Sequence, residues 1–298
     1  MDRISEQVEL TSHGYYRLKT IPGKKELAEY YHNKYFQTSQ GNYSRVYTPE
    51  EKQFFFNKNN EKFFVIQSIL GKETQLDILD IGCGEGFTMD FFLNHKMRIT
   101  GIDYSSDGIK KHNPHCLNHF IEGDIFSQIQ TLINQQNKYN VIWLDNVLEH
   151  VTDPEELLRN CLKLSAPEAV LVIEVPNDFS EIQMLALSSG SIKNPFWIVS
   201  PDHISYFSSD SLNRLAQSSG WKNETTLADF PIDFNLLNEN ANYINDKSKG
   251  RAAHLQRITI DNLIHNHNIE DVTTYYKALA KLGLGRQIIG FFTPEKSI

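Results

Sequence analysis

The chain has 298 residues, of which 40% are hydrophobic and 22% charged, values typical of a globular protein with a sizeable core. Its net charge of −8 argues against nucleic acid as the main partner, because clustered lysines and arginines bind phosphates. The charged N-terminus, Met1–Glu6, is unlike a signal peptide. Apolar runs of about seven residues are far shorter than the roughly 20 needed to cross a bilayer. We therefore expect a cytoplasmic protein with no membrane or nucleic-acid partner.

Residues 1–60 are rich in tyrosine and in polar side chains. Their pattern predicts helices over Glu26–Tyr35 and Glu50–Leu70, and Pro49 suits the start of the second helix. Apolar residues recur at helical spacing over Phe54–Leu70, so this helix is expected to pack on a sheet. We interpret residues 1–60 as an N-terminal cap that is helical and aromatic.

Strands and helices alternate between residues 76 and 175. The strands are apolar along nearly their whole length, which is typical of a parallel sheet with helices on both faces. The predicted strands are 76–81, 98–103, 117–122, 139–145 and 169–175, and the predicted helices are 87–95, 106–112, 125–135 and 154–165.

The pattern changes after Pro176. A helix is predicted over Glu181–Leu187, followed by a loop over Gly190–Tyr206. The sequence then predicts a helix over Ser208–Ser219, which ends at a glycine, and a sixth strand over Trp221–Leu227.

The most informative segment is the first predicted strand and the turn after it, L-D-I-L-D-I-G-C-G-E-G. Gly82, Gly84 and Gly86 stand between the strand and a helix, where glycine permits unusual backbone angles and leaves space for a ligand. Asp103 ends the next strand, roughly 20 residues past the glycines, which is the spacing of a group that binds ribose hydroxyls. The segment therefore predicts a nucleotide or nucleoside site.

The three cysteines, Cys83, Cys116 and Cys161, have no metal-like spacing, so we expect free thiols in a reducing compartment. Cys83 lies inside the glycine turn. A need for small residues there explains Cys83 better than a role as nucleophile.

Four segments together resemble the class I S-adenosylmethionine-dependent methyltransferase family: D-I-G-C-G-E-G, G-I-D-Y-S, G-D-I-F and L-D-N-V-L-E-H, in this order. The resemblance covers about Leu76–Phe230 and is specific as a set. It implies an α/β, Rossmann-like sheet of seven mostly parallel strands with helices on both faces. The family closes this sheet with an antiparallel strand, for which Arg286–Thr293 is the best candidate.

That assignment leaves an insertion before the last strand, with helical stretches over Arg251–His265 and Val272–Leu282. We expect three parts: the cap at 1–60, a methyltransferase core at 61–229 with 285–298, and a helical lid at 230–284. Residues 230–283 and the N-terminal 50 residues would form the acceptor pocket over the carboxyl ends of the strands, where open α/β sheets bind ligands.

The resemblance also implies which residues bind S-adenosyl-L-methionine. The glycine turn would lie beneath the amino-acid tail and ribose, with Asp80 near the amino group and Asp103 on the ribose hydroxyls. Asp124 would accept a hydrogen bond from the adenine amino group. The alternatives are a helix-capping role for Asp124 and a turn role for Asp103. The predicted cofactor site comprises Asp80, Gly82, Cys83, Gly84, Gly86, Phe87, Asp103, Tyr104, Asp124, Ile125, Asp145, Asn146 and Val147.

Methyl transfer is an in-line displacement in which positioning supplies much of the rate, and a hydroxyl nucleophile usually also needs a base. His203 and His150 are the candidates, since histidine titrates near neutral pH. His150 could instead form a structural hydrogen bond, and the Pro-Asp-His turn containing His203 could merely anchor the next helix. Acceptor-binding candidates are Tyr16, Tyr31, Tyr35, Tyr43, His203 and Tyr206.

The leading hypothesis is O-methylation of a small polar acceptor, sugar-like or other, by a monomer or homodimer. N- and C-methylation remain open. A nucleotide-dependent oxidoreductase would need glycine at position 87, which is Phe87. A non-catalytic partner subunit would not need the intact cofactor constellation. Asp145 and Asn177-Asp178 stand where some relatives bind a divalent cation, but the order of the last pair departs from that pattern, so no metal is expected.

Overall fold

The computed structural model describes residues 6–23, 46–71 and 75–295. The predicted helix over Glu26–Tyr35 lies outside these residues, as do the acceptor candidates Tyr31, Tyr35 and Tyr43.

A long helix, α3 (Pro49–Leu70), precedes the central sheet. Thr48 begins it with a capping box, in which the threonine hydroxyl accepts from the N–H of Glu51 and the Glu51 carboxylate accepts from the N–H of Thr48. The predicted helix over Glu50–Leu70 is thus confirmed.

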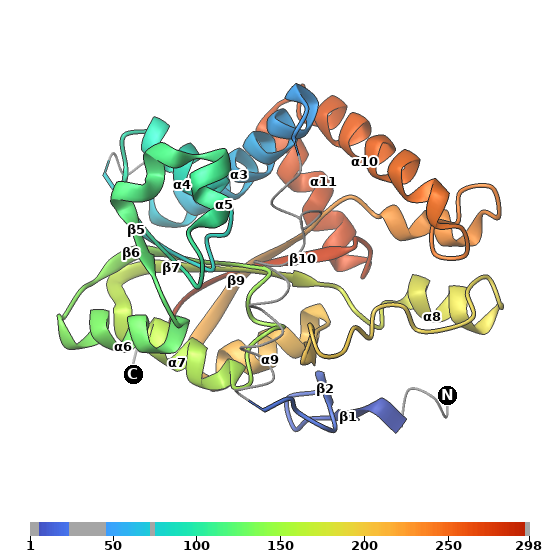
Figure 1. The fold of residues 1–298 in the computed structure, drawn as a ribbon, viewed down its shortest axis with the longest axis horizontal. Helices are drawn as coiled ribbons and strands as arrows, with labels where there is room; N and C mark the ends of the chain where they lie inside the picture. Colours follow the sequence, from blue (N-terminus) through green and yellow to red (C-terminus); the bar gives the residue numbers. More distant parts are fainter. Residues whose placement is uncertain (1–5, 24–45, 72–74, 296–298) are drawn as a thin grey trace.

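The central sheet has seven strands in the described part of the chain, in the order β5-β4-β3-β6-β7-β10-β9. Strands β3, β4, β5, β6 and β7 pair in parallel, whereas β10 runs antiparallel between β7 and β9 (Figure 1). The predicted fold class is confirmed, including the antiparallel last strand. The bounds are β3 Asp77–Ile81, β4 Arg98–Asp103, β5 Phe120–Glu122, β6 Tyr139–Asp145, β7 Ser165–Pro176, β9 Trp221–Ala228 and β10 Gln287–Pro294.

Helices cover both faces of this sheet (Figure 1). Apolar residues of α3, α4 (Phe87–Asn94), α5 (Asp107–His112) and α11 (Ile269–Lys281) form one buried cluster with the sheet, around Trp143. Residues of α6 (Ile125–Asn134), α7 (Pro154–Leu164) and α9 (Ser209–Ser218) form another on the opposite face. The two clusters hold the sheet as the middle layer of three.

Two local features differ from the sequence-based expectation. A 3-10 helix, η2 (Pro114–His119), occupies part of the strand predicted over 117–122, which leaves β5 with three residues. A hairpin of β1 (Val8–Leu10) and β2 (Tyr16–Leu18) was not predicted. It pairs with β8 (Ser205–Tyr206), inside the predicted loop over Gly190–Tyr206, to form a second, three-stranded sheet.

The insertion before β10 is largely helical, as predicted. It contains η3 (Ile232–Leu237), η4 (Lys247–Lys249), α10 (Gly250–Ile264) and α11. Helix α10 packs on α3, and η3 packs beside α8 (Glu181–Ser188), which follows β7. Helix α11 covers β9 and thereby completes one layer of the core. The role of this insertion as an acceptor lid stays a prediction.

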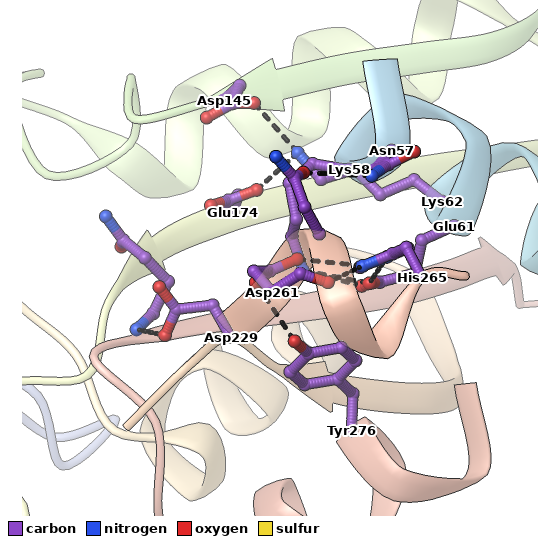
Figure 2. A network of polar contacts seen from close by, with 12 residues as sticks. Asn57, Lys58, Glu61, Lys62, Asp145, Glu174, Asp229, Asp261, His265 and Tyr276 are labelled. Carbon is purple, nitrogen blue, oxygen red and sulfur yellow. Dashed lines mark hydrogen bonds and ion pairs between the residues drawn. The ribbon is translucent and has the colours of Figure 1, made fainter. Parts of the chain in front are cut away.

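Buried polar contacts join α10 and α11 to α3 (Figure 2). His265 lies between two carboxylates, with Nε2 3.0 Å from Glu61 and Nδ1 2.8 Å from Asp261, and the Tyr276 hydroxyl donates to Asp261 at 2.9 Å. Burial alone would lower the pKa of His265, but the two carboxylates outweigh it and raise the pKa to about 9. His265 is therefore an imidazolium in the folded protein at neutral pH.

Because its pKa is raised on folding, protonated His265 stabilises the protein fully below the unfolded value of about 6.5, and this contribution is lost as the pH rises through about 9. We predict that His265→Gln lowers the free energy of unfolding by about 1–3 kcal/mol at low pH and by less above pH 9. Urea denaturation near pH 6 and at about pH 9.5 measures the difference. Parallel pH profiles for the wild type and the variant would contradict the assignment.

Candidate cofactor and active site

The glycine turn sits where β3 ends and α4 begins. The N–H groups of Gly82 and Cys83 both donate to the Ile102 carbonyl of β4, at 2.7 and 3.1 Å. Gly82, Gly84 and Gly86 all have positive φ, the region that glycine adopts without strain. A Cβ at Gly82 would come within 2.4 Å of the Val147 side chain, whereas a Cβ at Gly84 would meet no described atom closer than 4.0 Å. The turn is thus packed on one side and open on the other.

Asp103 is fixed at the end of β4. Its Oδ2 accepts from the N–H of Gly84 at 2.8 Å, and its Oδ1 accepts from the N–H of Ser105 at 3.3 Å. Burial raises the pKa of Asp103, although these backbone N–H groups oppose the effect. A carboxylate oxygen has more than one acceptor direction, so Asp103 retains acceptor capacity beside the glycine turn.

Asp80 is buried beneath the same turn, with 2% of its surface exposed. Its Oδ2 has no hydrogen-bond partner among the described residues. Burial raises the pKa of Asp80 well above its usual value, the charges of Asp145 and Asp103 raise it further, and Lys62 opposes them. A buried carboxyl without a partner is costly, so this position favours a ligand that brings a hydrogen-bond donor or a positive charge.

The turn Asp145–Val147 follows β6 and is held by side chains from α3 and β10. Asp145 Oδ2 lies 2.8 Å from Lys62 Nζ of α3, and Asp145 Oδ1 accepts from the Asn146 side-chain amide at 2.7 Å. Gln287 of β10 donates to Asn146 Oδ1 at 3.1 Å. Asn146 has a φ of 53°, and Val147 packs against Gly82. These contacts bring the second predicted cofactor segment against the glycine turn.

The remaining predicted cofactor residues lie around this edge or serve the fold. Asp124 caps α6 through its Oδ1, which accepts from the N–H and hydroxyl of Ser127. Helix capping, the alternative to cofactor binding, therefore accounts for one of its two carboxylate oxygens. Tyr104 is exposed, and Ile125 and Phe87 begin α6 and α4. Cys83 is a buried free thiol whose pKa burial raises well above its usual value, in keeping with a packing role.

The structure brings the two candidate bases together. The rings of His150 and His203 are 4.8 Å apart, and His150 Nδ1 lies 2.7 Å from the carbonyl oxygen of Asp202. Because a carbonyl only accepts, Nδ1 of His150 carries the proton in this contact. Nε2 of His150 is 3.7 Å from Glu149, which is 1% exposed. His150 therefore has the structural hydrogen bond that the sequence analysis weighed, and its ring lies beside that of the other candidate base.

Tyr16 and Tyr206, two acceptor candidates, are paired across β2 and β8. Tyr206 is buried, and its hydroxyl donates to the His203 carbonyl at 2.8 Å. Tyr16 stacks on Phe179 with ring centroids 4.3 Å apart. Tyr206 therefore fixes the loop that carries His203. The β1–β2 hairpin, which lies about 190 residues earlier in the sequence, thus pairs with the strand that follows His203 and supports the candidate site.

The two positions weighed for a metal both have protein partners. Asn177 donates to the carbonyls of Gly283 and Gly285, Asp178 pairs with Arg286 at 3.0 Å, and Asp145 pairs with Lys62. A different group could hold a metal ion: Glu149, His150 and His203 each offer a ligand atom, all within 4.8 Å of one another.

A family model described as a methyltransferase domain matches residues 48–226, more than half of the chain. The chain belongs to this family. Its members take their methyl group from S-adenosylmethionine, and the expected family assignment is confirmed. Among the described residues, no helix is long and apolar enough to cross a membrane.

Curated relatives include a ubiquinone biosynthesis O-methyltransferase from Caulobacter sp., 32% identical over 104 residues, which cover 34% of this chain and 41% of the relative. The enzyme of the same name from Coxiella burnetii is 25% identical over 145 residues, or 48% of this chain and 62% of that protein. The chain thus spans about two to three fifths of the length of these relatives.

Solved structures show the same fold. A putative sarcosine dimethylglycine methyltransferase from Galdieria sulphuraria has a TM-score of 0.51 and 14% identity, covering 91% of this chain and 99% of that one. A SAM-dependent methyltransferase from Archaeoglobus fulgidus has a TM-score of 0.50 and 16% identity, covering 90% and 99%.

The described residues fit S-adenosylmethionine. The Asp80 Oδ2 atom, which is buried and has no hydrogen-bond partner in the described structure, suits a ligand that brings a donor or a positive charge, and this cofactor carries a positive sulfonium and an amino group. The open side of Gly84 leaves room for a ligand beside Asp103. Residues 80, 82–84, 103 and 145–147 would hold the cofactor, which supplies an electrophilic methyl group.

Sequence reasoning missed Lys62, which binds Asp145, and the contact of the Tyr47 hydroxyl with Glu85 at 2.7 Å. A signal for Lys62 was present in the sequence. It stands one residue before Phe63, on a helix expected to pack on the sheet, where a lysine requires a buried partner.

Gly82→Ala and Gly84→Ala form a matched pair, since both glycines have positive φ but differ in surroundings. The left-handed backbone costs an alanine about 1–2 kcal/mol, and a forced contact adds about 1–3 kcal/mol. We predict that Gly84→Ala lowers the free energy of unfolding by the first amount, and Gly82→Ala by their sum. Chemical denaturation of both variants measures this. Equal losses would show that Val147 does not confine Gly82.

Proposed function

We propose that this chain transfers the methyl group of S-adenosylmethionine to a hydroxyl oxygen of a small polar acceptor. The buried Asp80 side chain beneath the glycine turn, whose Oδ2 has no hydrogen-bond partner in the described residues, is the observation that most supports a cationic cofactor. The pair of histidines at the same sheet edge supports a hydroxyl acceptor, because an alcohol must lose its proton as the methyl group is transferred.

The residues of the chain would act mainly by positioning. Asp103 would accept from ribose hydroxyls, Asp80 would face the amino group, and the turn Asp145–Val147 would fix the cofactor from the β6 side. Holding the reactants in line in this way replaces a bimolecular encounter with an oriented one.

The base would come from the His150–His203 pair. The Asp202 carbonyl orients the His150 ring through Nδ1, and the Tyr206 hydroxyl holds the backbone of His203. Either ring can then take the acceptor proton and pass it to solvent. The relatives named as O-methyltransferases lend support to an oxygen acceptor, at 25–32% identity over part of their length.

We predict that His203→Ala lowers turnover by about 10²–10⁴-fold and leaves the affinity for S-adenosylmethionine unchanged, the effect of losing a general base. The acceptor is first found by screening hydroxylated metabolites for formation of S-adenosylhomocysteine and of a methylated product. His150→Ala is measured beside it, with His115→Ala as an exposed control.

A large loss in His150→Ala alone would move the base to His150. Normal turnover in both variants would remove the pair from the chemistry. If only amines or carbon acids are methylated, the hydroxyl acceptor is wrong while cofactor use stands.

A further inference from the structure

Lys62 is a buried cation in the middle of an acidic sheet edge. Its side chain comes from α3, has 2% of its surface exposed, and lies over the Trp143 ring with Nζ 5.0 Å from the centroid. Nζ is 2.8 Å from Asp145 and also forms an ion pair with Glu174 (Figure 2). Asp145 and Glu174 are register partners at the ends of β6 and β7. A helix outside the sheet therefore supplies the charge that balances two strand ends.

This ion pair continues into the turn at the proposed cofactor site. Asp145 gives one oxygen to Lys62 and the other to the Asn146 side chain. The N–H of Asn146 donates to the Glu174 carbonyl at 2.9 Å, so both carboxylate residues that bind Lys62 also contact Asn146. Asn146 needs such support, because a positive φ is strained for a residue with a side chain.

We propose that Lys62 is a positioning residue for cofactor binding, acting through Asp145 to hold the turn Asp145–Val147. The inference rests on the proposed function. Without the ammonium group, the half-buried carboxylate of Asp145 would face the buried carboxyl group of Glu174 with no cation between them, and Asp80 lies nearby on the same sheet face. Mutual repulsion would then drive Asp145 away from Asn146 and release the turn.

Other charged groups surround this cluster. Lys58, on α3, and Glu149, beyond β6, both act on the cluster electrostatically, and Asp103 acts on Asp80 from β4. Lys58 provides a matched control for Lys62. It lies one helical turn earlier and is also buried, but its Nζ binds Glu61 at 2.9 Å and lies over the Tyr276 ring. It therefore serves the α3–α11 packing and does not contact Asp145 in the described structure.

The test is a double-mutant cycle on the full chain, with S-adenosylhomocysteine as the probe in titration calorimetry. Lys62→Met and Asp145→Asn should each weaken binding by about 10- to 100-fold. The double variant should bind no more weakly than the weaker single variant, because both changes break the same contact. Lys62→Arg keeps the cation and should bind more tightly than Lys62→Met.

Lys58→Met should lower the melting temperature yet bind S-adenosylhomocysteine like the wild type. Its effect on affinity should be independent of that of Asp145→Asn, so the two effects should add in the double variant. If Lys62 is purely structural, Lys62→Met will likewise lower the melting temperature and leave the affinity unchanged, and this result would overturn the proposal. Additive losses of affinity for Lys62→Met and Asp145→Asn would also overturn it. If Lys62→Met does not fold, the affinities of Lys62→Arg and Asp145→Asn for S-adenosylhomocysteine are compared with that of Lys58→Met, and the same criterion applies. Absence of binding by the wild type would overturn the proposed function itself.

Discussion

Burial of negative charge at one end of the central sheet is the constraint on which the site depends. Asp80, Asp145 and Glu174 lie on the sheet face that α3 covers, and Lys62 is the cation that contacts two of them. Removing carboxylates from water is costly unless each is paired or protonated. Lys62 balances Asp145 and Glu174, and Asp80 is left for a ligand. We propose that this carboxyl group receives a donor or cationic group of the ligand where the glycine turn leaves space.

The same constraint links the added helices to the core. Helix α3 carries Lys62 toward the sheet and Glu61 toward α10, where His265 joins Glu61 to Asp261. Figure 2 shows both sets of contacts close together, with Lys62 beside Asp145 and Glu174 and His265 beside Glu61 and Asp261. Helix α3 thus fixes the insertion and the cofactor turn at once.

Local chemistry explains why much of the fold, and the places of the glycine turn and Asp103 in it, could be predicted from the sequence. The apolar strands, the glycine turn and Asp103 depend on residues close in sequence, and the structure places them as expected. The features that were not predicted depend on partners far apart in the sequence. The β1–β2 hairpin pairs with β8 nearly two hundred residues later, and Lys62 meets Asp145 across a separation of 83 residues. No local pattern in either segment specifies such a partner, and the contact of His150 with His203 likewise exists only once the chain has folded.

The central claim is that this sheet edge binds a cationic nucleoside cofactor and not a dinucleotide. Titration calorimetry of the full chain with S-adenosylmethionine, and separately with NAD, tests it most directly. The account predicts saturable, stoichiometric binding of S-adenosylmethionine and no response to NAD, because Phe87 stands where a dinucleotide turn needs glycine. Saturable NAD binding without a response to S-adenosylmethionine would contradict it.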